Sequence, residues 1–417
     1  MPLLKSDRRR SNVFAIICVA CFFFGQSARS QDFKFDTTIS RPVLEHYLDR
    51  SISYTELLHD DLNQSRNEHG VAPKEAFRFI VDTKAKFVGR ALMLWGREKN
   101  FSNFVARAKP FASELHQADP DIVLQAAAFE IVTPDVGSLA VPPEVLKEFG
   151  QAVTIRMFNY QNMLYENGRF VNHWGRTGSV PDMSRLETRM WFYFLVTQYI
   201  DAGIEAVHFG QVGLMDKNDP GHAGWLDMLG HVRAYARKHA RRHMLICDAH
   251  TPTGGYVENG KLLFDFHSFP LRIAEVPDKP LKGVLKVGFS DSIVLKSKGG
   301  ITPSGWSCTN LPYLVEFDNF GRSREPGKPS KQPFIWGYDE ITWFSQLEEK
   351  ERNDWLRYAW DWVKKTDPNG HLQMPGSRLI TPAQRDGPRW YWSNNRSDQC
   401  PQGSNTEETI KVLWGTN

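Results

Sequence analysis

Short apolar runs recur along this chain, and each of them ends on a charged, imidazole or amide residue. The clearest runs span residues 122–130, 206–211, 244–250, 262–267, 313–318 and 334–340. Strands that are buried on both faces of a parallel sheet have continuous apolar sequences of this kind. The segments between the runs have apolar residues at helical spacing, as in 223–240 and 348–365. The pattern therefore predicts alternating strands and helices.

The number of apolar runs favours one architecture. Runs start near residues 86, 122, 206, 243, 262, 313, 334 and 371, and eight strands over about 300 residues fit a (β/α)8 TIM barrel with insertions. We therefore predict an α/β fold with a barrel catalytic domain over 72–380. The competing topology is an open doubly wound sheet, but no Gly-x-Gly-x-x-Gly follows an early strand to bind a dinucleotide.

Three further segments lie outside the regular alternation of the predicted barrel. Residues 31–71 are polar with helical spacing, which predicts an N-terminal helical extension packed outside the core. Residues 133–183 are rich in proline and turn residues, and they form a long insertion after the second predicted strand. Such long loops are usually functional. Residues 381–417 are predicted to be a C-terminal tail packed on the barrel.

The first thirty residues have the three parts of a secretory signal peptide. A basic start precedes an apolar core from Val13 to Phe24, and small residues follow up to Ser30. We expect residues 1–30 to be a signal peptide and the protein to be secreted or periplasmic; a retained anchor is the alternative. The chain's formal net charge is +3, but the first thirty residues carry five basic residues and one acidic residue, so the rest of the chain has a net charge of 3 − 4 = −1. A near-neutral mature chain predicts no nucleic-acid partner and, after cleavage, no membrane partner.

Three cysteines follow the predicted signal peptide. Cys247 lies inside an apolar run, which is typical of a small buried side chain. Cys308 and Cys400 lie in polar segments and could form a disulfide in an oxidising compartment. The spacing of cysteine and histidine indicates no structural zinc site.

The ends of three successive predicted strands carry paired polar residues. Residues two apart share a face of a strand, so Asp248 and His250 are expected to point the same way. The same spacing relates Asp265 to His267 and Glu316 to Asp318. In (β/α)8 enzymes the catalytic groups come from the carboxyl ends of several strands. We therefore expect these side chains to meet at the mouth of the barrel.

One chemistry that uses such a cluster is hydrolysis of a glycosidic bond. One carboxyl group protonates the leaving oxygen, and a second attacks the anomeric carbon or activates water. The catalytic candidates are Asp248, Glu316, Asp318 and Asp265. The chain holds thirteen tryptophans, and aromatic rings near strand ends can stack on sugars. The substrate-binding candidates are Glu130, His208, Gln211, His250, His267, Trp95, Trp306, Trp336, Tyr338 and Asp339.

Some of these candidates have a structural alternative. Glu130 could bind a sugar hydroxyl or pair with Arg90. Asp339 and Glu340 are adjacent, so at most one of them faces the mouth, and the other is expected to begin the following helix.

A second chemistry is metal-dependent hydrolysis or sugar isomerisation. Mixed imidazole and carboxylate ligands suit a divalent ion such as zinc, manganese or iron. In this interpretation the metal ligands are drawn from His208, Asp248, His250, Asp265, His267 and Glu316. The run at 86–95 ends in Leu-Trp and offers no ligand. The glycosidase interpretation needs no cofactor and is preferred to the metal-dependent one.

With Glu130, Asp248, Asp265, Glu316 and Asp318 at strand ends, the chain resembles the secreted (β/α)8-barrel glycoside hydrolases. The resemblance is architectural and covers residues 72 to about 380. It implies hydrolysis of a poly- or oligosaccharide, with Asp248 as nucleophile or base on the fourth strand and Glu316 or Asp318 as its partner on the sixth. Glu316 is the preferred acid, and His250 and His267 would orient the carboxylates. A barrel that binds glycans without catalysis is a third interpretation.

Overall fold

The computed structural model describes residues 32–417 except 68, 382–386, 388 and 417. The predicted signal peptide lies outside these described residues. Residues 33–417 form one compact unit. The three cysteines within it, Cys247, Cys308 and Cys400, are free thiols, so the structure does not contain the Cys308–Cys400 disulfide that the sequence left open.

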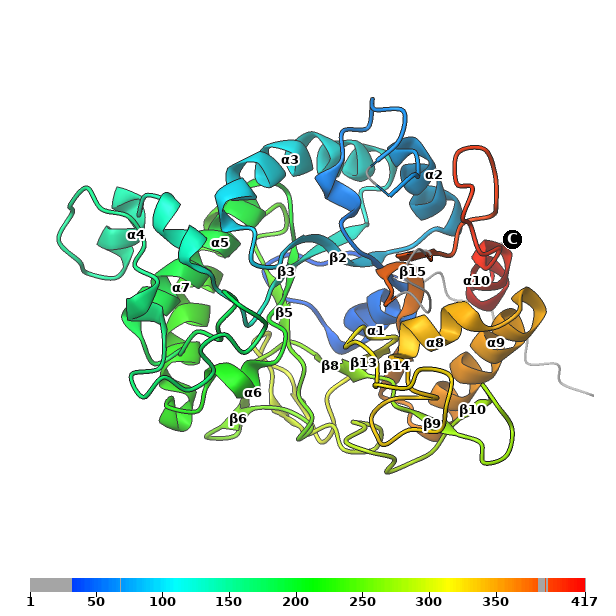
Figure 1. The fold of residues 1–417 in the computed structure, drawn as a ribbon. Coiled ribbons are helices and arrows are strands. Elements are labelled where there is room, and N and C mark those ends of the chain that lie inside the picture. The colour runs from blue at the N-terminus through cyan, green and yellow to red at the C-terminus, as the bar shows by residue number, and fades with distance from the viewer. Residues whose placement is uncertain (1–31, 68, 382–386, 388, 417) are drawn as a thin grey trace, which may run out of the picture. The chain divides into compact units, whose positions relative to one another are not determined.

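A seven-stranded sheet runs through the middle of this unit (Figure 1). Neighbouring strands in this sheet are parallel, except that β16, the last strand along the chain, is antiparallel to β15. In spatial order the strands are β16 (Trp390–Trp392), β15 (Met374–Leu379), β1 (Ser51–Tyr54), β2 (Phe87–Leu94), β3 (Val123–Ala128), β4 (Ala206–His208) and β5 (Ile246–Asp248).

A second parallel sheet contains β14 (Gly370–Leu372), β13 (Tyr313–Glu316) and β8 (His267–Pro270), in that order. It is connected to the larger sheet at both of its edges. β14 continues after one residue into β15, and β8 approaches β5 through the parallel bridge between His250 and Ser268. The strands are therefore consistent with a barrel, although they form two sheets rather than one closed sheet.

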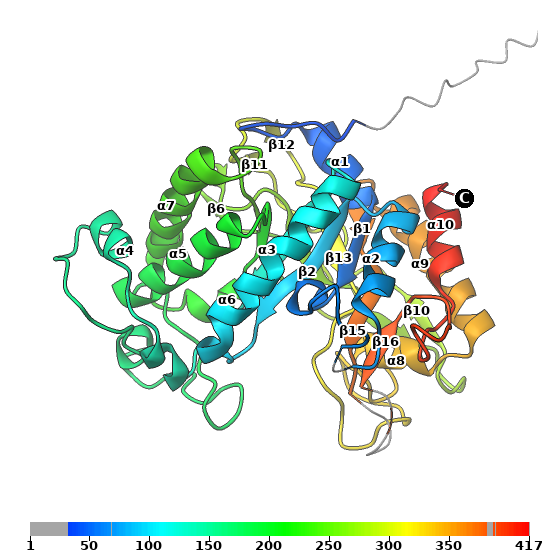
Figure 2. The same cartoon turned by 90° about the horizontal axis from the view of Figure 1, so that it is seen from above.

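Helices separate most of the parallel strands along the chain (Figure 2). α3 packs against β2, and α5 packs against both β3 and α7. The helices are α1 (Arg41–Asp49), α2 (Pro73–Thr83), α3 (Phe101–Ala118), α4 (Pro143–Glu148), α5 (Leu186–Asp201), α6 (Val212–Met215), α7 (Ala223–His239), α8 (Glu340–Gln346), α9 (Glu349–Thr366) and α10 (Glu407–Trp414).

Short strand pairs occupy the loops of the second half of the chain. They are β6 (Val257–Glu258) with β7 (Lys261–Leu262), β9 (Ile273–Glu275) with β10 (Gly283–Leu285), and β11 (Gly300–Ile301) with β12 (Ser307–Cys308). Five short 3-10 turns are also present among the described residues: 57–59, 98–100, 134–138, 161–163 and 220–222. None of the described helices is long and apolar enough to cross a lipid bilayer.

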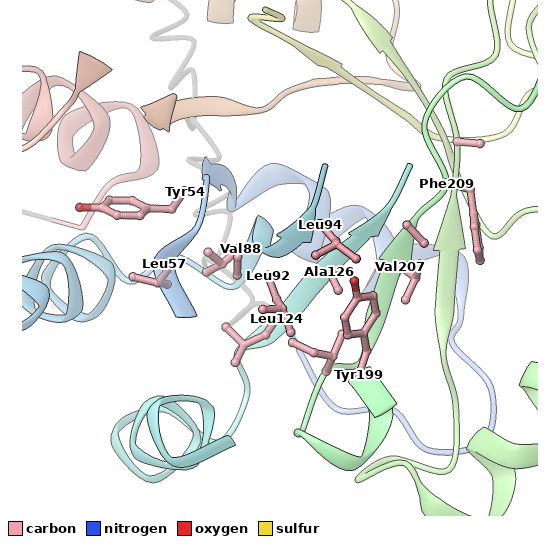
Figure 3. Packing of buried hydrophobic residues seen from close by; sticks show 14 of the residues in the cluster. Tyr54, Leu57, Val88, Leu92, Leu94, Leu124, Ala126, Tyr199, Val207 and Phe209 are labelled. Carbon is pink, nitrogen blue, oxygen red and sulfur yellow. The ribbon is translucent and has the colours of Figure 1, made fainter. Parts of the chain in front are cut away.

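The core explains why the strands have continuous apolar sequences. Val88, Leu124 and Val207 come from three adjacent strands and are fully buried, and Tyr199 of α5 lies against this layer (Figure 3). A second buried cluster, which includes Phe87, Val123 and Ala206, is formed by residues of opposite strand parity. Both faces of the sheet are therefore covered by apolar side chains.

The prediction for the N-terminal segment is wrong in one respect. Residues 31–71 do contain helix α1, but they also supply β1, which lies between β15 and β2 in the large sheet. β1 has only four residues, Ser-Ile-Ser-Tyr, and its two serines conceal the apolar pattern although all four residues are buried. Because β1 is the first strand, the long insertion follows the third strand, β3, and not the second.

Two predicted strands also differ from the structure. The run at 334–340 is not a strand among the described elements: Trp336 and Gly337 have positive φ angles, and α8 begins at Glu340. Its apolar residues Ile335 and Trp336 are buried in the core as part of a loop. The strand predicted at 262–267 is also displaced. It was expected to end at His267, but the observed strand β8 begins at that residue.

Candidate active site

A cavity of about 730 Å³ lies where several parallel strands end. Its lining comes from the segments that follow β1, β2, β3, β4, β5 and β13, together with β15 and β16. The carboxyl ends of parallel strands are where the active sites of barrel enzymes form. The lining residues are Thr55, Glu56, His69, Arg90, Met93, Trp95, Arg97, Phe129, Glu130, Trp174, Gly210, Gln211, His250, Asp318, Asn319, Phe320, Arg378, Leu379, Arg389 and Trp390.

Aromatic rings form part of the cavity wall. Trp95 is 38% exposed, and its ring meets Phe129 and Trp174 edge-on, with centroids 5.3 and 5.4 Å away. Trp174 belongs to the insertion after β3, and its Nε1 donates to the carbonyl of Glu130 at 3.0 Å. Trp390 of β16 contacts the ring of His69 at 4.1 Å. Trp95 is therefore braced by two rings while part of its surface stays open to the cavity.

Glu130 is held at the cavity by a neighbouring glutamine. Its carboxylate accepts hydrogen bonds from the backbone N–H of Gln211 at 2.9 Å and from the side-chain amide of Gln211 at 3.1 Å. Gly210 has a φ of +60°, and a Cβ atom there would overlap with Oε2 of Glu130. The turn after β4 therefore needs glycine for both its conformation and its close approach to Glu130.

Glu316 and Asp318 are held by two arginines. Arg378 donates from Nη1 to Glu316 at 2.9 Å and from Nη2 to Asp318 at 2.8 Å. Arg90 contacts the same Glu316 carboxylate and lies 3.6 Å from Asp318. Burial alone would raise the pKa of Glu316, but Arg90 and Arg378 lower it well below its usual range. Asp318 lines the cavity, whereas Glu316 is buried beneath it.

Asp248 and His208 form a buried network under the cavity. Asp248 accepts hydrogen bonds from Gln125 at 2.6 Å and Ser268 at 2.7 Å, and it contacts Nδ1 of His208 at 2.8 Å. Burial lowers the pKa of His208. Asp248 is 1% exposed and does not line the cavity. It is therefore placed to orient His208 and not to touch a substrate.

His250 connects this network to the arginine-bound carboxylates. Its Nε2 lies 2.7 Å from Oε1 of Glu316, and its ring meets the ring of His208 edge-on with centroids 4.7 Å apart. The structure therefore brings Asp248, His250, Glu316 and Asp318 together, as their spacing along the strands predicted. His250 and Asp318 line the cavity, and Asp248 and Glu316 lie beneath it.

Asp265 and His267 do not belong to this cluster. Asp265 accepts a hydrogen bond from the N–H of Cys247 at 2.9 Å and lies 3.6 Å from Arg233, and burial raises its pKa. Nδ1 of His267 lies 3.1 Å from the hydroxyl of Ser297, and burial lowers the pKa of His267 to about 3. Because β8 begins at His267, both residues lie at the opposite end of the strand from the cavity. The structure therefore does not bring them together with Asp248, His250, Glu316 and Asp318 as their spacing predicted.

Four further candidates are also absent from the cavity lining. Trp306 and Trp336 use Nε1 to bond backbone carbonyls, of Ile39 and Lys282 respectively. Tyr338 is buried as part of the loop that precedes α8. Asp339 caps the amino end of α8 by accepting the N–H of Thr342 at 2.9 Å. The expectation that one acidic residue of the Asp339-Glu340 pair begins a helix is confirmed, and neither lines the cavity.

Arg90 was not among the predicted site residues. Arg90 was considered only as a partner for Glu130, but it contacts Glu316 and Asp318 instead. A visible signal was available, because a charged residue inside the apolar run at 86–95 must have a buried partner. Trp390 and His69 had no comparable signal, since both lie outside the apolar runs.

No protein-family model and no curated protein matches the chain. Solved structures resemble it at 8–10% identity. Trehalose-6-phosphate hydrolase from Bacillus licheniformis matches over 49% of this chain and 44% of its own, with a TM-score of 0.31; this chain thus covers less than half of that enzyme. The debranching enzyme of Nostoc punctiforme matches over 88% and 79%, with a TM-score of 0.47. Endo-glycoceramidase II from Rhodococcus sp., in complex with ganglioside GM3, matches over 87% and 78%, with a TM-score of 0.38.

Proposed function

We propose that the chain is a glycosidase that hydrolyses a poly- or oligosaccharide bound in the cavity, with Glu130 as the acid and Asp318 as its partner carboxylate. The observation that carries this proposal is that two carboxyl groups with different electrostatic surroundings line one aromatic-walled cavity. Hydrolysis of a glycosidic bond requires such a pair, one group protonated and one ionised.

Asp318 has the surroundings of the ionised partner. Arg378 donates to it at 2.8 Å, and Arg90 lies 3.6 Å away. Of the two carboxylates, Asp318 is therefore the one that is ion-paired with arginine. The same arginines also bind Glu316, which fixes their position beneath the cavity.

Glu130 has the surroundings of the acid. Its hydrogen-bond donors are the two amide N–H groups of Gln211, and no cation of the described residues forms an ion pair with it. It is only 2% exposed and lines the cavity, and its surroundings differ from those of Asp318, which two arginines hold. Glu130 was predicted as a substrate-binding residue, so this role is a revision.

The reaction follows from these two groups. Glu130 donates its proton to the glycosidic oxygen, and the bond between that oxygen and the anomeric carbon breaks. Asp318 either forms a bond to the anomeric carbon, which water later hydrolyses, or removes a proton from the water that attacks it. In both routes Glu130 has lost its proton after the first step, and it regains a proton before the next cycle.

The cavity walls suit a sugar. The partly exposed Trp95 presents an apolar ring surface, and large aromatic side chains combine such a surface with little conformational freedom to lose. Arg389, Gln211 and Asn319 add polar groups to the lining. The parallel strands, which are consistent with a barrel, support the same proposal. Export through the signal peptide at residues 1–30 is part of the same proposal.

The test is hydrolysis of a broad panel of oligosaccharides by the purified mature chain, followed by substitution of the two carboxylates. Glu130→Gln and Asp318→Asn should each lower kcat by about 10²–10⁴-fold, the range expected for loss of an acid or base. Binding of the substrate, measured by calorimetry, should change much less. Asp135→Asn is the control, because Asp135 is a half-exposed acid in the insertion that follows β3. This variant should leave kcat unchanged.

Two results would contradict the proposal. Unchanged turnover in both variants would remove these residues from the mechanism. A wild-type chain that binds glycans but releases no reducing ends would instead indicate a glycan-binding protein.

A further inference from the structure

We infer that His208, His250 and Glu316 form a binding site for one divalent transition metal, with zinc preferred, directly beneath the cavity. One possible ligand atom from each of these three residues lies within 4.8 Å of the other two. All three residues are buried. Two imidazoles and one carboxylate are a common three-ligand set for zinc.

The hydrogen bonding of His208 supports this inference. Asp248 also accepts hydrogen bonds from Gln125 and Ser268, so its carboxylate acts as an acceptor toward Nδ1 of His208, which therefore carries the proton. Nε2 of His208 is then left with a lone pair. This atom is buried and has no hydrogen-bond partner among the described residues. A buried polar atom without a partner is costly and needs an explanation.

The same arrangement is typical of a metal-bound histidine. A histidine ligand usually donates its other ring N–H to a carboxylate, which fixes the tautomer and the orientation of the ring. Asp248 does this for His208, from the neighbouring strand β5. The ring of His250 lies beside that of His208, with centroids 4.7 Å apart, and both residues offer a ligand atom to the same cluster.

The other two ligands are also held in place. Nε2 of His250 lies 2.7 Å from Oε1 of Glu316, an oxygen that Arg90 also contacts, and a metal ion would replace the direct contact between His250 and Glu316. Arg378 donates to the other carboxylate oxygen, as hydrogen-bonding residues around ligating carboxylates often do. The three carboxylates of Asp248, Glu316 and Asp318 outnumber the two arginines, so the cluster keeps one negative charge toward a cation.

The test is metal content, which does not depend on enzymatic activity. The full chain, without an affinity tag, is incubated with ZnCl₂, passed through a desalting column and analysed for zinc. We expect about one zinc per wild-type chain. His208→Gln and His250→Gln should lose it, and Asp248→Asn should weaken zinc binding by about 10–100-fold, the usual effect of removing a residue that orients a ligand.

His267→Gln is the matched control, because His267 is also buried with an unpartnered Nε2 but belongs to no ligand cluster of the described residues. It should bind zinc like the wild type. Equal zinc content in wild type and folded His208→Gln, with folding checked by circular dichroism, would overturn the inference. Glu130→Gln should lose hydrolysis and keep zinc, so failure of this site and failure of the proposed reaction are distinguishable.

Discussion

Arg90 places a positive charge inside an otherwise apolar strand. The residue is almost fully buried, has a φ of +58°, and lies where the register between β2 and β3 shifts. A buried charge is tolerated when it is paired, and removing one partner typically costs about 3–5 kcal/mol. Arg90 is therefore held by the carboxylates of Glu316 and Asp318, at the end of β13 and just after it.

Spacing along a strand predicted the main cluster but not the depth of each residue. Asp248 and His250 share a face, as predicted, yet only His250 reaches the cavity. The difference arises because Asp248 lies within β5 while His250 follows it. Asp265 and His267 have the same spacing but a different position, because their strand begins where the apolar run ends. The alternation of side chains along a strand shows which residues share a face. Only the boundaries of the strand show at which end of the sheet those residues lie.

His267 predicts a pH dependence of stability at the residue scale. Its pKa is about 3 in the folded chain because of burial, against 6.5 as the ordinary value. The unfolded chain thus binds a proton first, so stability is fully present above pH 6.5 and decreases as the pH falls toward 3. Linkage gives a loss of about 2 kcal/mol between pH 7 and pH 5. His267→Gln should remove this part of the dependence, measured as the free energy of unfolding by urea at several pH values.

The control for His267 is His239→Gln, which removes an exposed histidine at the end of α7. If both variants show the same pH dependence as the wild type, His267 does not carry the effect.

At the scale of elements, the turn after β4 connects backbone conformation to the proposed acid. Gly210 has a positive φ, and its lack of a side chain leaves room for Glu130. Gly210→Ala should destabilise the chain by about 1–2 kcal/mol for the left-handed conformation, with a further loss for overlap, and should lower activity by displacing Glu130. Urea unfolding and hydrolysis rates measure the two effects.

Gly260→Ala is a matched comparison for this turn. Gly260 also has a positive φ, of +74°, but no atom lies within 4 Å of its Cβ position. It should show only the conformational cost and keep full activity. Equal stability losses and equal activities in the two variants would show that the contact with Glu130 is unimportant.

The elements also show where apolar patterns are informative. The runs that became β2, β3, β4, β5 and β13 are covered on both faces, so their sequences are continuously apolar. β1 was missed because it is short and contains two serines. The loop at 334–338 was misread because burial makes a sequence apolar whether or not its backbone pairs with a strand. β1 and this loop differ in whether the backbone pairs with a distant strand, and composition does not show that difference.

At the scale of the whole molecule, the two ends of the described chain are built into one sheet. β1 pairs with β15, more than 300 residues later, and Tyr54 of β1 donates to Asn394 at 3.2 Å and packs against Trp392. Most of the parallel strands were predicted from the sequence, although β1 was missed and the run at 334–340 is not a strand. The contact between the ends was not predicted. No apolar pattern can show which distant segments are neighbours.

Tyr54 tests this connection. Tyr54→Ala should destabilise the chain by about 3–5 kcal/mol, as is usual when a buried aromatic side chain is removed. Tyr54→Phe removes only one hydrogen bond and should cost about 1 kcal/mol. The measurement is urea unfolding followed by fluorescence, with one cooperative transition expected. Similar losses in both variants would mean that the ring contributes little at the junction.

The position of β1 has a consequence for synthesis on the ribosome. β1 emerges early, and β2 can cover one of its edges soon afterwards, but its other edge pairs with residues 374–377. That edge stays open until nearly the whole chain has been made. Contacts between such distant segments slow folding, and an unpaired strand edge promotes aggregation during the delay. We therefore expect the nascent chain to depend on chaperones until its last parallel strand is released.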